Sequence, residues 1–168
     1  DCVLSHLMVD HAGGVGCLAP GTRVWVQRAE WDYAHGPSPD RLAYRPADLP
    51  PLSAGELDVR LIEGDAAPWP GIRLLLTPGH CPGHMSMLVE LPDGWIALAA
   101  DAADTQRNLT ERIAPGILLA GRDQALASLD RFREEATALG ALMIPGHDPE
   151  VWDLIPRSFG SSATERVP

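Results

Sequence analysis

The chain has 168 residues and a mass of 18.0 kDa, and 13 basic residues against 23 acidic ones give it a formal net charge of −10. This balance argues against a partner that presents phosphate groups, such as nucleic acid or an anionic lipid surface, because either would need a basic face. Hydrophobic residues make up 45% of the sequence, too many for a disordered chain, yet no apolar run reaches the roughly 18 residues of a membrane span. We therefore expect a single globular domain over residues 1–168 that binds neither nucleic acid nor membrane.

The cysteines and the first residue bear on the compartment and on the extent of the domain. Cys2, Cys17 and Cys81 form neither a CxxC pair nor an even set of disulfide partners, so we expect a reducing compartment, the cytoplasm. The sequence begins at Asp1 rather than Met, and residues 2–4 already read as the middle of a buried strand. For that reason we expect the domain to be incomplete at its N-terminal end.

Short apolar runs, each followed by a polar side chain that can bind a metal, are the main pattern along the chain. They are residues 3–4 before His6, Ile72–Leu76 before His80, residues 95–100 before Asp101 and residues 142–144 before His147. Runs of this length bounded by Gly and Pro are typical of buried strands, so the polar residues are expected on loops at strand ends. Such loops can converge on one site.

Between the first two of these runs the sequence predicts a short helix and then a long excursion. The helix is expected over residues 28–35. Residues 36–70 contain seven prolines, too many for regular structure throughout, although residues 59–62 could form a strand. We predict a surface excursion rather than a domain linker, because strands that carry the candidate ligands flank it on both sides.

The second half of the chain predicts a hairpin and a longer helix. Strands at Met85–Leu91 and 95–100 are joined by a Pro-Asp-Gly turn, which suits an antiparallel hairpin. Residues 121–140 carry apolar side chains at 3–4 residue spacing, with Asp123 as a plausible N-cap and Gly140 at the left-handed position after the last turn. Strands and helices are thus expected to alternate around a mixed sheet.

The segment 5–14 holds the densest group of candidate ligands. It places His6, Asp10 and His11 within six positions and ends at a Gly pair that lets backbone approach closely. Imidazole and carboxylate are ligands that suit Zn²⁺ and similar divalent ions. His80 and His147 each follow a Pro-Gly turn, and Asp101 follows an apolar strand with no basic neighbour in sequence, which suits a carboxylate that bridges two cations.

The order of these residues resembles the metallo-β-lactamase superfamily, whose hallmark is HxHxDH followed by His, Asp and His. Here the order is HxMxDH over 6–11, PGH ending at His80, Asp101, and GH ending at His147. Longer segments at 5–14, 77–86, 101–103 and 146–149 are similar to the branch that contains N-acyl homoserine lactone lactonases. The resemblance implies an α/β fold, the αββα sandwich of metallo-β-lactamase type, with the metal centre at one edge of the two sheets. Chains of that family normally begin with further strands and a helix, so it also implies that part of the N-terminal half is missing.

The resemblance further implies a set of metal ligands. The first metal would be held by His6 and His80, and the second by Asp10, His11 and His147, with Asp101 as the bridge. The implied cofactor is Zn²⁺, as one or two ions, or another divalent metal.

Two positions depart from the family pattern. Met8 stands where the second His of HxHxDH is expected, and a soft, neutral thioether suits Zn²⁺ poorly, so we expect a mononuclear or unevenly occupied centre. Asp104 stands where lactonases usually carry a Tyr, and an ionised carboxylate there could not donate a hydrogen bond to substrate.

The implied activity is metal-dependent hydrolysis of a lactone, with N-acyl homoserine lactones as the substrate class, which corresponds to quorum quenching. Asp10 would return a proton to the leaving alkoxide. Two alternatives stay open: a thioesterase of the glyoxalase II kind, which would be expected to supply basic residues for an anionic thiol, and a degenerate member that binds metal without catalysis. Missing strands would expose a sheet edge, so self-association into a homo-oligomer is also expected.

The remaining histidines and other residues of interest have plainer interpretations. His35 is expected at the surface, and His84 is expected to pack near the ligands. The five tryptophans could line an acyl-chain pocket, although packing in the core or at its rim is the more common use of Trp. Cys81 is expected to be structural, and Met85 to lie in the core.

Overall fold

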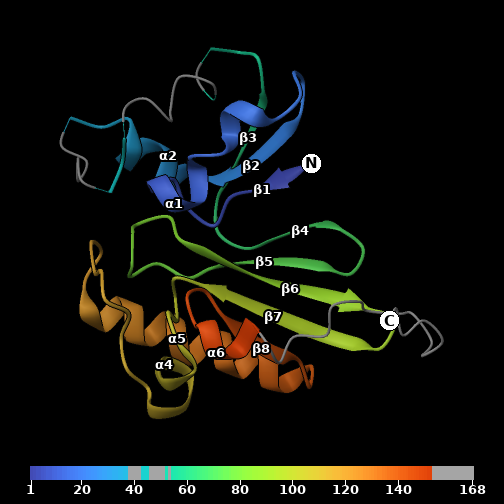
Figure 1. Ribbon diagram of the computed structural model, residues 1–168, viewed down its shortest axis with the longest axis vertical. Coiled ribbons are helices and arrows are strands. Elements are labelled where there is room, and N and C mark those ends of the chain that lie inside the picture. Colours follow the sequence, from blue (N-terminus) through green and yellow to red (C-terminus); the bar gives the residue numbers. More distant parts are fainter. Residues whose placement is uncertain (38–42, 46–51, 53, 153–168) are drawn as a thin grey trace, which may run out of the picture.

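The computed structural model describes residues 1–37, 43–45, 52 and 54–152, which form two β-sheets stacked between helices (Figure 1). Helix α2 packs against the first sheet, and α4 and α5 lie beyond the second. This order of layers confirms the predicted αββα sandwich. The 5-stranded sheet is mixed, as expected, whereas the 3-stranded sheet is parallel throughout.

The first sheet has the order β1-β2-β3, with β1 at Cys2–Val3, β2 at Arg23–Gln27 and β3 at Asp58–Ile62. Helix α2, at Arg28–Ala34, follows β2 directly and packs against β2 and β3, which confirms the predicted helix to within one residue. β2 was not predicted, because its apolar run is only three residues long and is bounded by Arg23 and Gln27. Val24 and Val26 are nevertheless fully buried, and this alternation is what holds the strand in the sheet.

The second sheet has the order β4-β5-β6-β7-β8. Its strands are β4 at Ala66–Trp69, β5 at Ile72–Leu76, β6 at Met85–Leu91, β7 at Gly94–Ala100 and β8 at Leu142–Pro145. β6 and β7 form the predicted antiparallel hairpin, in which Leu91 pairs with Gly94, and β8 runs parallel to β7. The carboxyl ends of β7 and β8 therefore meet at one edge of the sheet, where Asp101 and His147 follow them.

The excursion over residues 36–70 contains more regular structure than predicted. β3 confirms the strand expected at 59–62, but β4 was missed because it includes Pro68. A proline cannot donate to the ladder, yet it is tolerated here because β4 is the edge strand of its sheet. The parts of the excursion at 38–42, 46–51 and 53 lie outside the described residues.

The long helix α5, at Arg122–Ala138, confirms the predicted core-facing helix. Leu126, Leu129, Phe132 and Ala136 are buried on one side of it, and it packs against β7 and β8. The expectation that Asp123 caps it was wrong, because the N-cap lies two residues earlier, at Gly121, whose φ of 101° needs a glycine. Gly140 takes the predicted left-handed conformation, with φ of 61°.

Several shorter helices lie between the strands. They are α1 at Val9–Ala12, a 3₁₀ turn at Val15–Cys17, α4 at Gln106–Glu111 and α6 at Pro149–Trp152. No helix within the described ranges is long and apolar enough to cross a bilayer.

Three contacts fix one sheet against the other. Trp25 of β2 meets Trp69 of β4 edge to face with ring centroids 5.2 Å apart, and Gln27 Nε2 donates to the carbonyl of Gly64 at 2.6 Å. The backbone N–H of Met85 donates to the carbonyl of Ser5 at 2.9 Å. The loop that carries His6 is thereby held against the start of β6 in the other sheet.

Candidate metal centre

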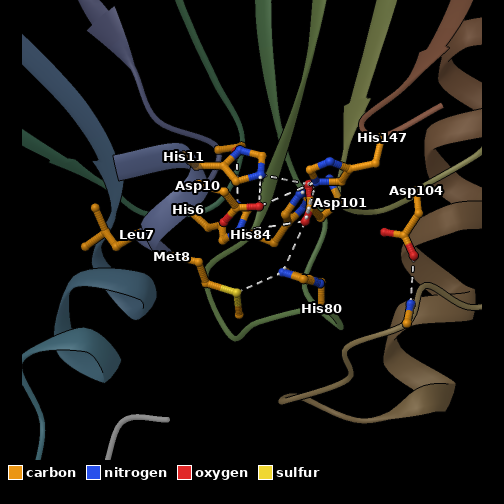
Figure 2. A network of polar contacts seen from close by, with 12 residues as sticks. His6, Leu7, Met8, Asp10, His11, His80, His84, Asp101, Asp104 and His147 are labelled. Atoms are coloured by element: carbon orange, nitrogen blue, oxygen red, sulfur yellow. Dashed lines mark hydrogen bonds and ion pairs between the residues drawn. The ribbon is translucent and has the colours of Figure 1, made fainter. Parts of the chain in front are cut away.

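Asp101 lies at the centre of a cluster that draws on loops from both sheets (Figure 2). Its carboxylate oxygens lie 3.1 Å from His11 Nε2, 3.3 Å from His147 Nε2, 3.4 Å from His80 Nε2 and 4.0 Å from His6 Nε2. Asp101 is only 4% exposed. A single buried carboxylate therefore faces four imidazole nitrogens.

The candidate ligands fall into two groups that share Asp101. The first group is His6, His80 and Asp101. The second group is Asp10, His11, Asp101 and His147. Within each group the ligand atoms lie within 4.8 Å of one another. These are the six residues that the sequence singled out, divided as the family resemblance implies. The first group is buried, whereas Asp10 and His147 of the second group are exposed at its rim.

The segment after β1, which includes α1, places five of its residues in or beside the cluster. Met8 stands at the N-cap of α1, so Asp10 and His11 lie on the first turn of that helix, facing the loop after β7. Ser5 Oγ lies 3.0 Å from His6 Nδ1 and 3.2 Å from His11 Nδ1. One hydroxyl thus orients both rings through their Nδ1 atoms and leaves both Nε2 atoms directed at Asp101.

Two glycines bring the other histidines close to the cluster. Gly79 has φ of 146°, and a Cβ there would lie 2.3 Å from Ala125 Cα in α5. A Cβ at Gly146 would lie 2.7 Å from the carbonyl oxygen of Ala100. Each turn therefore needs a glycine, because the backbone that presents the next histidine touches a neighbouring element directly.

The residue before Asp101 has an unusual backbone conformation. Ala100 has φ of 47°, in the left-handed region that a residue with a Cβ seldom adopts. The conformation ends β7 sharply and turns Asp101 toward the histidines. Strain of this kind is found mostly where a functional group must be aimed.

Four buried polar atoms of the cluster have no hydrogen-bond partner. They are His6 Nε2, His11 Nε2, His80 Nδ1 and Asp101 Oδ1. His11 Nε2 and Asp101 Oδ1 are close enough for an ion pair, but their orientation does not make a hydrogen bond. Since buried polar groups are nearly always paired, unpaired nitrogen and oxygen atoms gathered in one place fit a site for a divalent cation.

The charge states also suit a cation. Burial lowers the pKa of His6 and of His80, which keeps both imidazoles neutral, the form that binds metals. Burial alone would raise the pKa of Asp101, but the surrounding imidazoles of His11, His6 and His80 hold it well below its ordinary value. The first group thus offers an anionic carboxylate beside two neutral imidazoles.

The two departures from the family pattern occupy different places. Met8 is 3% exposed, and its Sδ lies 3.1 Å from His80 Nε2, inside the first group. The Asp104 carboxylate accepts a hydrogen bond from the backbone N–H of Gly116 at 2.8 Å (Figure 2). Met8 therefore contacts the candidate centre, and Asp104 serves a neighbouring loop.

Two buried residues near the centre hold it together. His84 was expected to pack near the ligands, and it does, since its Nε2 accepts a hydrogen bond from the backbone N–H of Asp101. Glu30 of α2 was not predicted, although an acidic residue in a short helix beside a core could have been noticed. It accepts hydrogen bonds from the backbone N–H groups of Leu7 and Gly83 and from the Tyr44 hydroxyl, and so ties together the loops that carry His6 and His80.

The other expectations concern residues away from the centre. His35 is exposed and stacks on Trp31 with ring centroids 4.0 Å apart, which confirms its surface position. Cys81 and Met85 are buried, and neither belongs to the two ligand groups. A cavity of about 200 Å³ lies beside His11 with mainly apolar lining, and no tryptophan with a described side chain lines it.

Residues 3–147 match the family described as the metallo-beta-lactamase superfamily, and the chain belongs to that superfamily. Among curated relatives, it is 36% identical over 151 residues to an N-acyl homoserine lactonase of Bacillus cereus, covering 88% of this chain and 55% of that protein. It is 35% identical over 169 residues to the N-acyl homoserine lactonase AttM of Azorhizobium caulinodans, covering 94% of this chain and 61% of that protein. The chain thus spans well under two thirds of these relatives.

Solved structures agree with the fold. An N-acyl homoserine lactone hydrolase with the product N-hexanoyl-L-homoserine at its catalytic metal centre superposes with a TM-score of 0.75 at 32% identity. That match covers 92% of this chain and 58% of the solved one. The dizinc quorum-quenching lactonase AidC gives a TM-score of 0.68 at 20% identity, over 88% of this chain and 56% of the other, and supports the fold alone.

Proposed function

We propose that the chain is a metallo-hydrolase domain that opens the lactone ring of N-acyl homoserine lactones. The observation that carries the proposal is the convergence of two ligand groups on one shared carboxylate, Asp101. The function of the relatives, N-acyl homoserine lactonase, supports the choice of substrate.

In this proposal His6 and His80 would hold one metal, Asp10, His11 and His147 would hold the other, and Asp101 would contribute to both sites. Zn²⁺ fits the nitrogen and oxygen donors, and the second group is expected to bind it more firmly because its ligand set is complete. A divalent ion bound there supplies Lewis acidity to the lactone carbonyl and makes a water acidic enough to attack near neutral pH.

The side chain of Asp10 is placed to handle the proton of the leaving group. It is 53% exposed, and its Oδ2 lies 3.5 Å from His11 Nε2 and 3.7 Å from His147 Nε2. A carboxyl group at the rim of the centre can reach both the substrate and the ligands. We assign Asp10 the return of a proton to the alkoxide released when the ring opens.

The charge of the site favours a lactone over a thioester of an anionic thiol. The candidate ligands are His and Asp, and the chain as a whole has 13 basic residues against 23 acidic ones. A neutral lactone needs no basic partner, whereas a glutathione-like thiol would. The apolar cavity beside His11 offers a place for the acyl chain.

The proposal also includes a compartment and partners. The three cysteines are free thiols, which suits the cytoplasm. The acidic balance argues that neither nucleic acid nor a membrane is a partner. Self-association through a sheet edge stays a prediction that sedimentation can test.

The test is ring opening by the full chain loaded with Zn²⁺. Hydrolysis of N-hexanoyl-homoserine lactone is followed by proton release at constant pH and by a mass gain of one water. Asp101→Asn should abolish turnover, and Asp104→Asn, in the same loop, should preserve it because an amide oxygen can still accept from Gly116. Cleavage of a glutathione thioester but not of the lactone would favour the thioesterase, and metal binding with neither activity would favour a degenerate member.

A further inference from the structure

Met8 faces the candidate centre rather than the core alone. The two residues before α1 point in opposite directions in Figure 2: Leu7 is directed away from the histidines, and Met8 toward His80. Met8 is 3% exposed, and its Sδ lies 3.1 Å from His80 Nε2. The thioether therefore takes the place of a third donor in the first group.

Two buried imidazoles complete the surroundings of this sulfur. His6 is fully buried and its Nε2 has no hydrogen-bond partner, while His80 is 3% exposed and its Nε2 is shared between Met8 Sδ and Asp101. The two rings meet edge to face at 74°, with centroids 4.8 Å apart. The Met8 sulfur thus contacts the His80 ring, which in turn contacts the His6 ring, and all three side chains are shielded from water.

We propose that His6, His80 and Met8 form a site for a soft monovalent cation, Cu⁺, for which Ag⁺ is an analogue that does not change oxidation state under assay conditions. Thioether sulfur selects Cu⁺ over hard divalent ions, and imidazole accepts either. The same residues that make the first group a poor Zn²⁺ site therefore make it a good Cu⁺ site.

Charge favours the same assignment. The first group has one carboxylate, Asp101, and shares it with the second group, which has Asp10 as well. If the second group holds a divalent ion, a monovalent neighbour meets half the electrostatic repulsion that a second divalent ion would meet at the same distance. The inference rests on the proposed function only in assuming that the second group holds a divalent ion. It does not require that the chain hydrolyses lactones.

Thiols are the competing ligands for soft cations and must be separated from Met8. Cys17 is exposed, Cys2 is partly exposed, and Cys81 is buried beside His80 in sequence. The experiment therefore uses the full chain carrying Cys2→Ser and Cys17→Ser as its background, and tests Cys81→Ser separately.

The direct readout is the methyl group of methionine. The chain has four methionines, so protein labelled with ¹³C at the methionine methyl gives four signals, of which the Met8 signal is identified by its loss in Met8→Leu. Titration with Ag⁺ in the presence of Zn²⁺ should shift the Met8 signal until one ion is bound per chain. The signals of Met85, Met87 and Met143 should stay in place.

The affinity for Cu⁺ is measured without oxygen by competition with bicinchoninate. Met8→Leu, of similar volume, should lower it by about 100-fold because one of three donors is lost. Met85→Leu is the matched control, since Met85 is also buried but its sulfur contacts Gln27 rather than a candidate ligand, and it should leave the affinity unchanged. Thermal unfolding followed by circular dichroism identifies any variant that fails to fold.

Two results would overturn the inference. One is a Met8 methyl signal that does not respond to Ag⁺, and the other is Cu⁺ affinity that depends on Cys81 but not on Met8. Failure of lactone hydrolysis with Zn²⁺ alone would contradict only the proposed function, because the Met8 signal and the Cu⁺ affinity report the first group independently.

Discussion

The backbone N–H of Asp101 donates a hydrogen bond to His84 Nε2 at 3.0 Å, and this contact defines the tautomer of a fully buried imidazole. Because Nε2 accepts, the proton of the neutral ring lies on Nδ1, which is 2.9 Å from Thr77 Oγ1 and 3.1 Å from the Thr77 carbonyl oxygen. The loop that carries His80 is thereby joined to the loop that carries Asp101.

The hydrogen bonds that continue from His84 through Thr77 and Ser86 all run in one donor-to-acceptor direction. Ser86 Oγ donates to the carbonyl of Ala99, so it accepts from Thr77 Oγ1, which in turn accepts from His84 Nδ1. The chain of donors returns to β7 two residues before Asp101. Such a closed network holds the shared carboxylate in place without binding it directly.

His84→Ala should therefore weaken metal binding without removing a ligand. It leaves the buried Asp101 N–H without an acceptor, at a cost of about 1–3 kcal/mol in the free energy of unfolding. Zn²⁺ affinity should fall by about 10- to 100-fold, as for other residues that orient metal ligands. His84→Gln should restore part of both, since its amide can accept from Asp101 and donate to Thr77. Equal metal affinity in His84→Ala and the native chain would contradict this role.

Glu30→Gln should destabilise the fold more than the same substitution at an exposed glutamate. The carboxylate accepts from the N–H groups of Leu7 and Gly83 and from the Tyr44 hydroxyl. A glutamine would turn an N–H group toward one of these donors, at a cost of about 1–3 kcal/mol in urea-induced unfolding. The control is Glu63→Gln, whose side chain is 74% exposed and pairs with Arg28, and a change under about 0.5 kcal/mol is expected there.

The metal content of the purified chain should lie nearer one tightly bound Zn²⁺ than two. The second group keeps Asp10, His11 and His147 with the shared carboxylate, whereas the first group has only two imidazoles and Asp101 for a divalent ion. Elemental analysis after dialysis checks this directly. Two firmly held zinc ions would mean that Met8 does not weaken the first group, and none would remove the support for either group.

Met8→His should raise both zinc occupancy and lactone hydrolysis. The side chain is long enough for the new imidazole to reach His6 and His80, which gives the first group three nitrogens. If about 1.4 kcal/mol of transition-state stabilisation is gained, the rate rises tenfold. The comparison is kcat/KM of the two proteins in excess Zn²⁺. Occupancy that rises to two ions without a gain in rate would place the defect elsewhere.

The metal-free chain should lose stability as the pH falls below neutrality. Burial lowers the pKa of His6 and His80, and lowers the pKa of His84 to about 3, so the folded state does not take up protons that the unfolded histidines bind near pH 6.5. Stability contributed by these groups is present above pH 6.5 and is lost progressively below it. Asp101 raises the pKa of His11, although burial opposes this. The effect of His11 on stability therefore has the opposite sign, because the folded state binds its proton more readily than the unfolded state does.

The size of this effect can be measured for one histidine. At pH 5.5 the His84 contribution alone amounts to about 1 kcal/mol. Urea midpoints of the chelator-treated protein at pH 7.5 and 5.5 should differ accordingly, and the difference should shrink by that amount in His84→Gln. A stability that is flat over this range would show that the buried histidines take up protons in the folded state.

The sequence predicted the parts of the site that depend on strand ends and tight turns. His80 and His147 follow Pro-Gly, and Asp101 follows a long apolar run, so local chemistry was enough to place them. β2 and β4 were missed for opposite reasons, since β2 has a short apolar run and β4 contains a proline that only an edge strand accepts.

What the sequence could not give was the set of contacts made at long range. Glu30 lies 23 residues from Leu7 and 53 from Gly83, and no local pattern links them. The direction of Asp104 depends on Gly116, in a loop that the sequence left unassigned. These contacts follow from how the layers pack, and only a three-dimensional structure reveals them.

The contact between Gly79 and Ala125 has a consequence for how this protein tolerates mutation. Any side chain at position 79 would need space that the backbone of α5 already occupies, and at Ala125 anything larger than alanine would push against the turn that presents His80. In a saturation library the two positions should therefore tolerate few substitutions, and the permitted residues at one should depend on the residue at the other. A change inside the hydrophobic layer beneath the sheet would thus be transmitted to the candidate centre, although no ligand had been altered.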